Sequence, residues 1–107
     1  MLAQQRQAAI RSLHLDVLFL GLHGMIERAG FTTPNLMEAD TDRALVAAAE
    51  RLVVLADHTK WGTVRISSIA ALRDADTLVT DSGLPEPVRI RLAELVGELA
   101  VAEVGTR

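Results

Sequence analysis

Apolar runs separated by polar and glycine-containing segments predict alternating strands and helices along the chain. Leu15–Leu20 is almost continuously apolar, which is typical of a strand buried on both faces of a parallel sheet. Leu52–Ala56 predicts a second such strand, rich in β-branched residues, and Asp76–Asp81 predicts a third. A weaker run, Leu99–Ala102 followed by Val104, predicts a final strand.

Helical patterns lie between and before these strands. Residues 2–13 are mostly strong helix formers with a thin apolar stripe, which predicts a surface helix laid on the sheet. Asn35 is a predicted N-cap, and Glu38 three residues later completes a capping box. The helix that they start should run to about Arg51. A second amphipathic pattern, Leu84–Val96, predicts the last helix, with Gly97 as its C-cap.

The remaining segments give weaker signals. Residues 25–34 predict a loop that ends in Gly-Phe-Thr-Thr-Pro, and residues 67–71 predict a short helix. Met37, Leu45 and Ala48 mark the expected apolar face of the helix that starts after Asn35. The resulting order of helices and strands predicts one α/β domain with a mostly parallel sheet of about four strands and right-handed crossovers.

The predicted strands end in polar residues. Because ligands of open α/β sheets bind at the carboxyl ends of strands, these residues are the candidate site. A lysine, hydroxyls, glycine amides and a helix N-terminus suit a phosphate, while carboxylates and a histidine suit sugar hydroxyls. The candidates on this edge are Gly21, His23, Gly24, Thr32, Thr33, Asn35, Asp57, Lys60, Thr80 and Asp81.

Each candidate also has a structural explanation. Lys60 could be a solvated loop lysine, Asp57 could cap the next turn, and His23 between two glycines could serve a turn. Trp61 suits a core or lid position, and His58 is expected to be exposed. These alternatives remain open from the residues alone.

Several other chemistries do not fit the residue pattern. The three histidines show no zinc-ligand spacing, and no Gly-x-Ser-x-Gly nucleophile elbow is present. A phosphoacceptor receiver domain would need an acidic pair after its first strand, where Leu20–His23 has none. We therefore expect no metal, no cofactor and no catalytic residue.

Composition narrows the class further. The chain has 107 residues, which suits one domain, and 50% of them are hydrophobic, which is enough for a core. A net charge of −3 with scattered arginines and 3% aromatic residues argues against a nucleic-acid surface. The lack of cysteine excludes disulfides, and no apolar run is long enough to span a bilayer. We expect a soluble, cytoplasmic protein without membrane contact.

Five stretches, in order, resemble a known family. They are Asp16–Met25, Gly30–Asn35 with its Thr-Thr-Pro-Asn, the pair Glu38-Ala39, the Ala-Asp-His-Thr-Lys-Trp-Gly of Ala56–Gly62, and Leu78–Asp81. Together they resemble the sensor domain of DeoR-type bacterial transcriptional regulators over about residues 12–96. This domain is similar to the fold of ribose-5-phosphate isomerase and glucosamine-6-phosphate deaminase, and the Asp-x-x-Lys of Asp57–Lys60 looks like that of the isomerase.

The resemblance implies a Rossmann-like three-layer fold, here only in part, and a domain that senses a phosphorylated sugar or related metabolite for a DNA-binding domain. It places the ten candidate residues on or near ligand-facing loops, with Lys60 in direct contact with the ligand. The chain has Gly24-Met25-Ile26 where many members have Gly-Ile-Asp, so an acidic group of the family pattern is missing.

The resemblance also implies that the front of the family is absent here. Only the predicted helix at 2–13 precedes the first strand, with no helix-turn-helix and no glycine-rich phosphate loop before it. We interpret the chain as a truncated sensor domain that touches DNA only through a domain it lacks. An uncovered sheet edge then predicts a homo-oligomer or dependence on a separate chain. The alternatives are a sugar-phosphate isomerase or deaminase relative and a dimerisation remnant without ligand.

Overall fold

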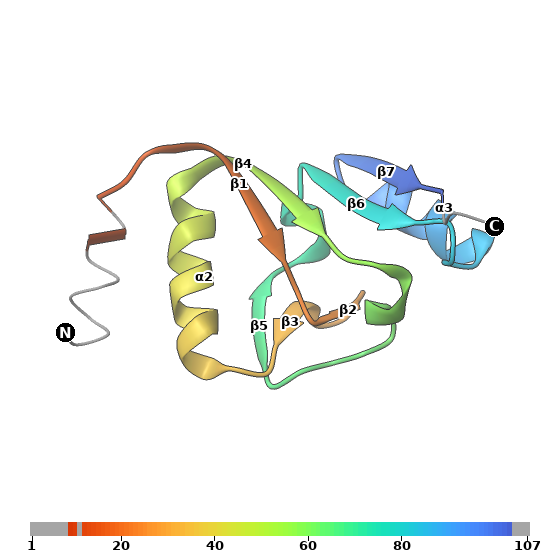
Figure 1. Ribbon diagram of the computed structural model, residues 1–107, viewed down its shortest axis with the longest axis horizontal. Helices are drawn as coiled ribbons and strands as arrows, with labels where there is room; N and C mark the ends of the chain where they lie inside the picture. The colour runs from red at the N-terminus through yellow and green to blue at the C-terminus, as the bar shows by residue number, and fades with distance from the viewer. Residues whose placement is uncertain (1–8, 11, 104–107) are drawn as a thin grey trace.

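A four-stranded parallel sheet forms the frame of the protein. The computed structural model describes residues 9, 10 and 12–103. The strands β1 (Leu15–Gly21), β4 (Ala49–Leu55), β6 (Thr77–Asp81) and β7 (Glu98–Ala102) lie side by side in that order (Figure 1). Every neighbouring pair is parallel. The predicted α/β class, its parallel sheet and its four strands are confirmed, although β4 begins three residues earlier than predicted.

The helices are crossovers between these strands. Helix α2 (Leu36–Ala48) leads to β4 and α3 (Glu86–Leu95) leads to β7, while the 3-10 helices η1 (His58–Lys60) and η2 (Leu72–Asp74) lie between β4 and β6. Each step moves to the next strand in the same direction across the sheet. Right-handed crossovers that all step in one direction fall on one face of a sheet. The described chain therefore builds a sheet and one covering layer.

A second, antiparallel sheet belongs to this covering layer. It contains β2 (Gly24–Ile26), β3 (Gly30–Thr33) and β5 (Ser67–Ala70), in the order β2-β3-β5. The predictions of a loop over residues 25–34 and of a short helix at residues 67–71 were therefore wrong. The strands have only three or four residues, which is too short for a clear two-residue period, and their pairing is set by distant partners.

Helix α2 differs from its prediction in length and orientation. It ends at Ala48 rather than about Arg51, because the chain from Ala49 onward pairs with β1. Its buried residues are Ala39, Asp42 and Ala44, whereas Met37, predicted on the apolar face, is 57% exposed. Small side chains on the buried face let the helix approach the sheet closely, and Leu36 and Met37 of its first turn are left outside, while Val46 near its end packs against the core.

The remaining helix predictions fare differently. Helix α3 is confirmed, and Val96 is its C-cap, with the predicted cap Gly97 immediately after it. A Cβ on Gly97 would strike the carbonyl of Asp76, so close approach to a neighbouring loop explains this glycine. The surface helix predicted over residues 2–13 lies mostly outside the described residues. No helix in the described part of the chain is long and apolar enough to cross a membrane.

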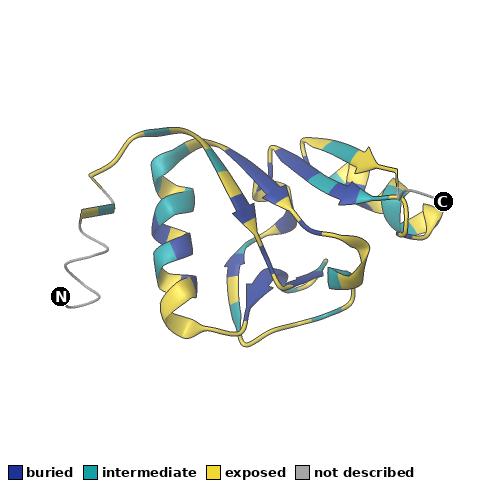
Figure 2. Cartoon of the chain, in the orientation of Figure 1, coloured by how far each residue is buried: buried dark blue, intermediate teal, exposed yellow. Residues whose placement is uncertain are grey.

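The hydrophobic core lies between the two layers. It collects Leu20, Leu52, Val54 and Leu78 from the parallel sheet, and it reaches Phe31 and Met25 of the antiparallel sheet and Leu92 of α3. Alternate residues of β1 point away from this core, and Val17 is 41% and Phe19 66% exposed. Exposed and partly buried bands therefore alternate along β1 (Figure 2). The prediction that β1 is buried on both faces was therefore wrong: it is an edge strand with one covered face.

Candidate functional site

The ends of three parallel strands meet at one edge of the sheet, as the sequence predicted. Gly21, the last residue of β1, is in register with Leu55 at the end of β4. Ala56, directly after β4, donates its N–H to the Val79 carbonyl of β6. Strand β2, which follows β1 in the chain, contacts the loop after β4, because the Gly62 N–H donates to the Met25 carbonyl at 2.9 Å. This edge is the candidate site.

Asp57 organises the turn that follows β4. Its Oδ1 accepts the Thr59 N–H at 2.8 Å and the Thr59 hydroxyl, so Asp57 is the N-cap of η1. Its Oδ2 lies 3.5 Å from Nζ of Lys60, the only lysine of the chain. The hydrogen bonds from Thr59 lower the pKa of Asp57, and Lys60 adds to that effect. Asp57 is thus both the predicted cap and a charged group at the edge.

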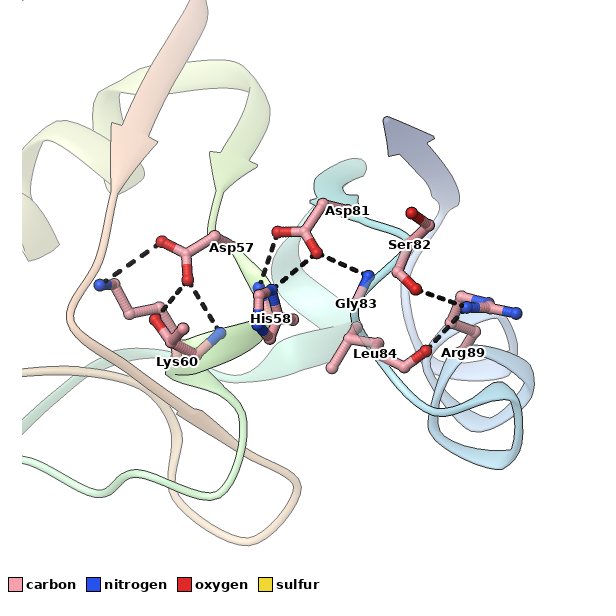
Figure 3. Close-up of polar contacts among 9 residues, drawn as sticks. Asp57, His58, Lys60, Asp81, Ser82, Gly83, Leu84 and Arg89 are labelled. Atoms are coloured by element: carbon pink, nitrogen blue, oxygen red, sulfur yellow. Dashed lines mark hydrogen bonds and ion pairs between the residues drawn. The ribbon is translucent and has the colours of Figure 1, made fainter. Parts of the chain in front are cut away.

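Asp81 ties this turn to the end of β6. Its Oδ2 accepts the His58 N–H at 3.0 Å, and its Oδ1 lies 2.8 Å from the His58 Nδ1 (Figure 3). The Gly83 N–H also donates to Oδ1, at 2.8 Å. These bonds, first that from the His58 backbone, lower the pKa of Asp81. The carboxylate therefore stays ionised and fixes the loops after β4 and β6 against each other.

The ring of His58 lies against two residues of the segment that ends β6 and follows it. Its Nδ1 contacts Asp81, and Gly83 lies beside the same part of the ring, next to Nδ1 and Cγ. A Cβ on Gly83 would lie 2.6 Å from Cγ of His58, so only glycine leaves room for the ring. The side chain is 45% exposed, as predicted, yet its orientation is fixed. The sequence did not predict that His58 contacts Asp81. The signal that could have indicated this contact is that the two residues lie at the ends of neighbouring strands, β4 and β6.

A second polar group lies at the start of α2. The Asn35 side chain accepts the Glu38 N–H at 3.0 Å, which confirms the predicted N-cap. Glu38 Oε1 lies 3.8 Å from Nε2 of the half-exposed His23. One turn further, Asp42 is buried with no partner for Oδ2. Burial raises the pKa of Asp42, the charge of Glu38 raises it further, and His23 opposes them.

The two polar groups are separate among the described residues. No hydrogen bond or ion pair in this part of the chain joins His23 to Asp57, Lys60 or Asp81. The structure thus brings together Asp57, Lys60 and Asp81, with His58 added to them. Asn35 and His23 form their own group, with Glu38 added.

The predicted hydroxyl ligands are buried rather than exposed. Thr32, Thr33 and Thr80 each have at most 3% of their surface exposed. The Thr32 hydroxyl accepts the Arg65 N–H at 2.9 Å, whereas those of Thr33 and Thr80 have no hydrogen-bond partner. Gly21 is exposed at the edge, and Gly24 is buried against Thr32 and the carbonyl of Thr63.

Asp57, His58 and Asp81 are the one described group that could offer ligands to a metal ion. One ligand atom from each lies within 4.8 Å of the others. The carboxylates, however, already accept backbone N–H groups, and the Lys60 ammonium lies beside Asp57. A cation at this group would have to compete with these donors.

A pocket of about 300 Å³ lies elsewhere, between η2 and α3. Arg91 lines it and forms ion pairs with Glu27 and Glu94. The hydrogen bond from Arg91 lowers the pKa of Glu27, and the two carboxylates raise the pKa of Arg91. Arg91 is thus already neutralised, whereas Arg73, which also lines the pocket, forms no ion pair among the described residues.

Comparisons with known proteins give a consistent picture. A family model described as the DeoR C terminal sensor domain matches residues 1–82. The HTH-type transcriptional regulator GolR of Listeria innocua is 34% identical over 73 residues, which cover 68% of this chain and 29% of that protein. The putative aga operon transcriptional repressor of Escherichia coli O157:H7 is 30% identical over 81 residues, 76% of this chain and 30% of that protein.

A third relative, the transcriptional repressor AccR of Agrobacterium fabrum, is 31% identical over 88 residues, 75% of this chain and 34% of that protein. The chain therefore spans about a third of the length of the curated relatives it matches.

Proposed function

The chain belongs to the family of DeoR C-terminal sensor domains, and from this membership we propose that it senses a phosphorylated sugar or a related small metabolite for a transcriptional regulator. The observation that carries the proposal is the group of Asp57, His58, Lys60 and Asp81 at the carboxyl edge of neighbouring parallel strands. This is where open α/β sheets bind their ligands.

Each member of the group suits one part of such a ligand. Lys60 is a cation for a phosphate. Its ammonium lies 3.5 Å from Asp57 in a partly exposed ion pair, and its flexible side chain can turn from Asp57 to a ligand. His58, oriented by Asp81, presents Nε2 to a sugar hydroxyl. Gly21 leaves backbone accessible at the same edge. The His23 and Asn35 group, with the buried Thr32, Thr33, Thr80 and Gly24, would shape the adjoining wall.

We assign any DNA contact to a helix-turn-helix domain outside these 107 residues. GolR and a second relative, from Bacillus subtilis, are both named HTH-type transcriptional regulators. Each is about three times as long as the region that matches this chain. A net charge of −3 also gives this domain no basic surface for a phosphate backbone. We further propose that the domain works in the cytoplasm and as a homo-oligomer.

The fluorescence of Trp61, the only tryptophan and the neighbour of Lys60, offers a direct test. Glucose 6-phosphate and ribose 5-phosphate are titrated into the protein, with the unphosphorylated sugars and inorganic phosphate in parallel. We expect a saturable change with a sugar phosphate that is weakened about tenfold or more in Lys60→Gln. Arg28→Gln, which removes an exposed charge outside the group, should bind as the wild type does. Binding that survives Lys60→Gln unchanged would contradict the assigned site.

The second candidate is aldose–ketose isomerisation, and one observation favours it. The pairing of His58 with Asp81 is the arrangement that orients a general base. Incubation of ribose 5-phosphate with the purified chain, followed by analysis for the ketose phosphate, distinguishes the two. We expect no conversion above a His58→Gln control, since sensing requires only binding.

A further inference from the structure

The pocket between η2 and α3 shares no residue with the group of Asp57, His58, Lys60 and Asp81. Its volume of about 300 Å³ lies at the lower end of the range that small-molecule pockets occupy. The residues that line it are Glu27, Ala71, Leu72, Arg73, Arg91 and Leu95. They combine apolar side chains with two guanidinium groups and one carboxylate, which is a lining suited to a small amphipathic ion.

One part of the lining is apolar and belongs to the hydrophobic core. Leu72 is 3% exposed, and the partly buried Leu95 packs against the same core. Ala71 adds a third apolar residue to the lining. A ligand placed against these side chains gains by removing apolar surface from water, so the pocket favours an aliphatic or aromatic body over a polyol.

A second part of the lining is fixed by an ion pair between distant segments. Nε of Arg91 lies 3.1 Å and 3.2 Å from the two carboxylate oxygens of Glu27, and Nη2 also contacts Oε1. Glu94 accepts from Nη1 of Arg91 at 3.2 Å. Because Glu27 follows β2 and Arg91 lies on α3, these contacts hold two sides of the pocket in position. A lining that is already ordered lowers the free-energy cost of binding a ligand.

Arg73 supplies the unpaired charge of the pocket. Two acidic residues lie within three positions of it in the sequence, but each carboxylate is bonded elsewhere. Oδ2 of Asp74 accepts the Ala71 N–H at 2.9 Å, and Oδ2 of Asp76 accepts the Leu52 N–H at 2.8 Å. In the part of the chain that the structure describes, no ion pair includes Arg73. Its guanidinium is therefore available to an anion in the pocket.

The charges of the lining determine which anion fits best. Arg73 and Arg91 carry two positive charges and Glu27 one negative charge, so the lining has a net charge of +1. A carboxylate has one charge and matches the planar guanidinium of Arg73 with two parallel hydrogen bonds. A phosphate monoester carries nearly two negative charges at pH 7, and Glu27 would repel the second. The pocket thus favours a monoanion.

We propose that this pocket binds a small monocarboxylate with an apolar body, with its carboxylate on Arg73 and its body against Leu72 and Leu95. Arg91 remains paired with Glu27 and shapes the wall beside the ligand. This ligand differs in charge and body from the phosphorylated sugar proposed for the edge of the sheet, so the two proposals are independent. Because so small a ligand makes few contacts, we expect a dissociation constant on the order of 1 mM.

Benzoate, a monocarboxylate with a flat apolar ring, is the probe for a test with the whole chain. It is titrated to about 20 mM into ¹⁵N-labelled protein at pH 7 and constant ionic strength, and the amide signals are followed by NMR. The amides of Ala71, Leu72 and Leu95 should shift and saturate, whereas those of Thr59 and Lys60 should not. Benzamide lacks the charge and acetate lacks the ring, so each should bind about tenfold or more weakly. Phenyl phosphate should also bind more weakly than benzoate.

Three substitutions test the roles of the charges. Arg73→Gln should weaken benzoate binding about tenfold or more, because it removes the unpaired guanidinium. Arg65→Gln removes an exposed arginine that does not line the pocket, and it should bind benzoate as the wild type does. Glu27→Gln should strengthen binding about threefold, since it removes the negative charge and releases Arg91. Circular dichroism melts check that each variant is folded.

The two proposed sites can fail separately. Lys60→Gln should leave benzoate binding unchanged, and Arg73→Gln should leave the response of Trp61 to sugar phosphates unchanged. The absence of saturable shifts up to about 20 mM, or shifts confined to Thr59 and Lys60, would overturn the proposal of a carboxylate pocket. Equal affinity for benzamide, tighter binding of phenyl phosphate, or a folded Arg73→Gln protein that binds benzoate like the wild type would also overturn it.

Discussion

The carboxylate of Asp81 binds His58 at two points, with Oδ1 2.8 Å from the ring Nδ1 and Oδ2 3.0 Å from the backbone nitrogen. Because Asp81 ends β6 and His58 follows β4, this contact joins the loops of two neighbouring strands. It also commits Nδ1 to Asp81 and leaves Nε2 as the ring nitrogen for a ligand. The candidate site is thus partly organised before any ligand binds.

The lowered pKa of Asp81 predicts a dependence of stability on acid. A carboxylate with a folded-state pKa below its unfolded value of about 3.9 contributes stability above that value, and the contribution is lost as pH falls through the folded pKa. The Asp81→Asn variant has no ionisable group at this position, so it lacks this pH-dependent contribution to stability. We therefore expect the melting temperature of the wild type to fall more steeply below about pH 5 than that of the variant. Parallel curves in circular dichroism melts would contradict this role of Asp81.

The effect of Asp42 on stability should depend on pH in the opposite direction. Burial raises its pKa, so the folded state disfavours the charged form and loses stability as pH rises above the unfolded pKa. Asp42→Asn should then be more stable than the wild type at pH 7, by about 1 kcal/mol. Since Oδ2 has no partner, the change breaks no bond to that atom.

The measurement for Asp42 is a set of melting temperatures across pH. For a domain of this size, 1 kcal/mol corresponds to about 4–8 °C, and the gain should shrink below about pH 4. Asp16→Asn, at an exposed position of β1, should leave the melting temperature nearly unchanged. A destabilised Asp42→Asn protein would show that the carboxylate has a favourable partner.

Gly24 should be far less tolerant of a side chain than Gly21. A Cβ on Gly24 would overlap the Thr32 hydroxyl and the Thr63 carbonyl, and backbone atoms cannot easily move. Gly24→Ala should cost about 1–3 kcal/mol. At Gly21 the nearest atom is the Leu55 carbonyl oxygen at 3.9 Å, so Gly21→Ala should be nearly neutral. Urea unfolding of the two variants measures the difference, and equal costs would contradict the packing around β2.

Asn35 should contribute to the stability of α2 through one hydrogen bond. Its side chain accepts the Glu38 N–H at 3.0 Å, so Asn35→Ala should cost about 1 kcal/mol. Asn35→Asp keeps an acceptor oxygen and should retain the wild-type stability. Thermal unfolding followed at the helical band gives both values. If the aspartate variant lost as much as the alanine variant, the capping bond could not be the cause.

The sequence predicted the frame of the fold well because its strands and caps carry strong local signals. The apolar runs at residues 15–20 and 52–56 indicated strands, and Asn35 with Glu38 marked the helix start. The antiparallel strands were missed because β2 and β5 contain only three and four residues. Their identity depends on pairing with β3, which no local pattern reveals.

The residues of the candidate site also differ in how far local sequence predicts them. Asp57 and Lys60 could be predicted as a pair because they lie three residues apart after a strand. The contact between His58 and Asp81 spans 23 residues and requires the strand order of the sheet, so His58 was expected only to be exposed. Thr32, Thr33 and Thr80 were predicted from sequence position alone, and only the structure showed that they are buried.

The sequence by itself therefore determined the α/β class, the parallel strands and the residues available at their carboxyl ends. These follow from periodicity and residue type, which act over a few positions. Only the tertiary structure decided that all crossovers of the described chain lie on one face of the sheet and that Asp81 orients His58. Such facts depend on which distant segments become neighbours, and burial against a common core decides that for the whole chain at once.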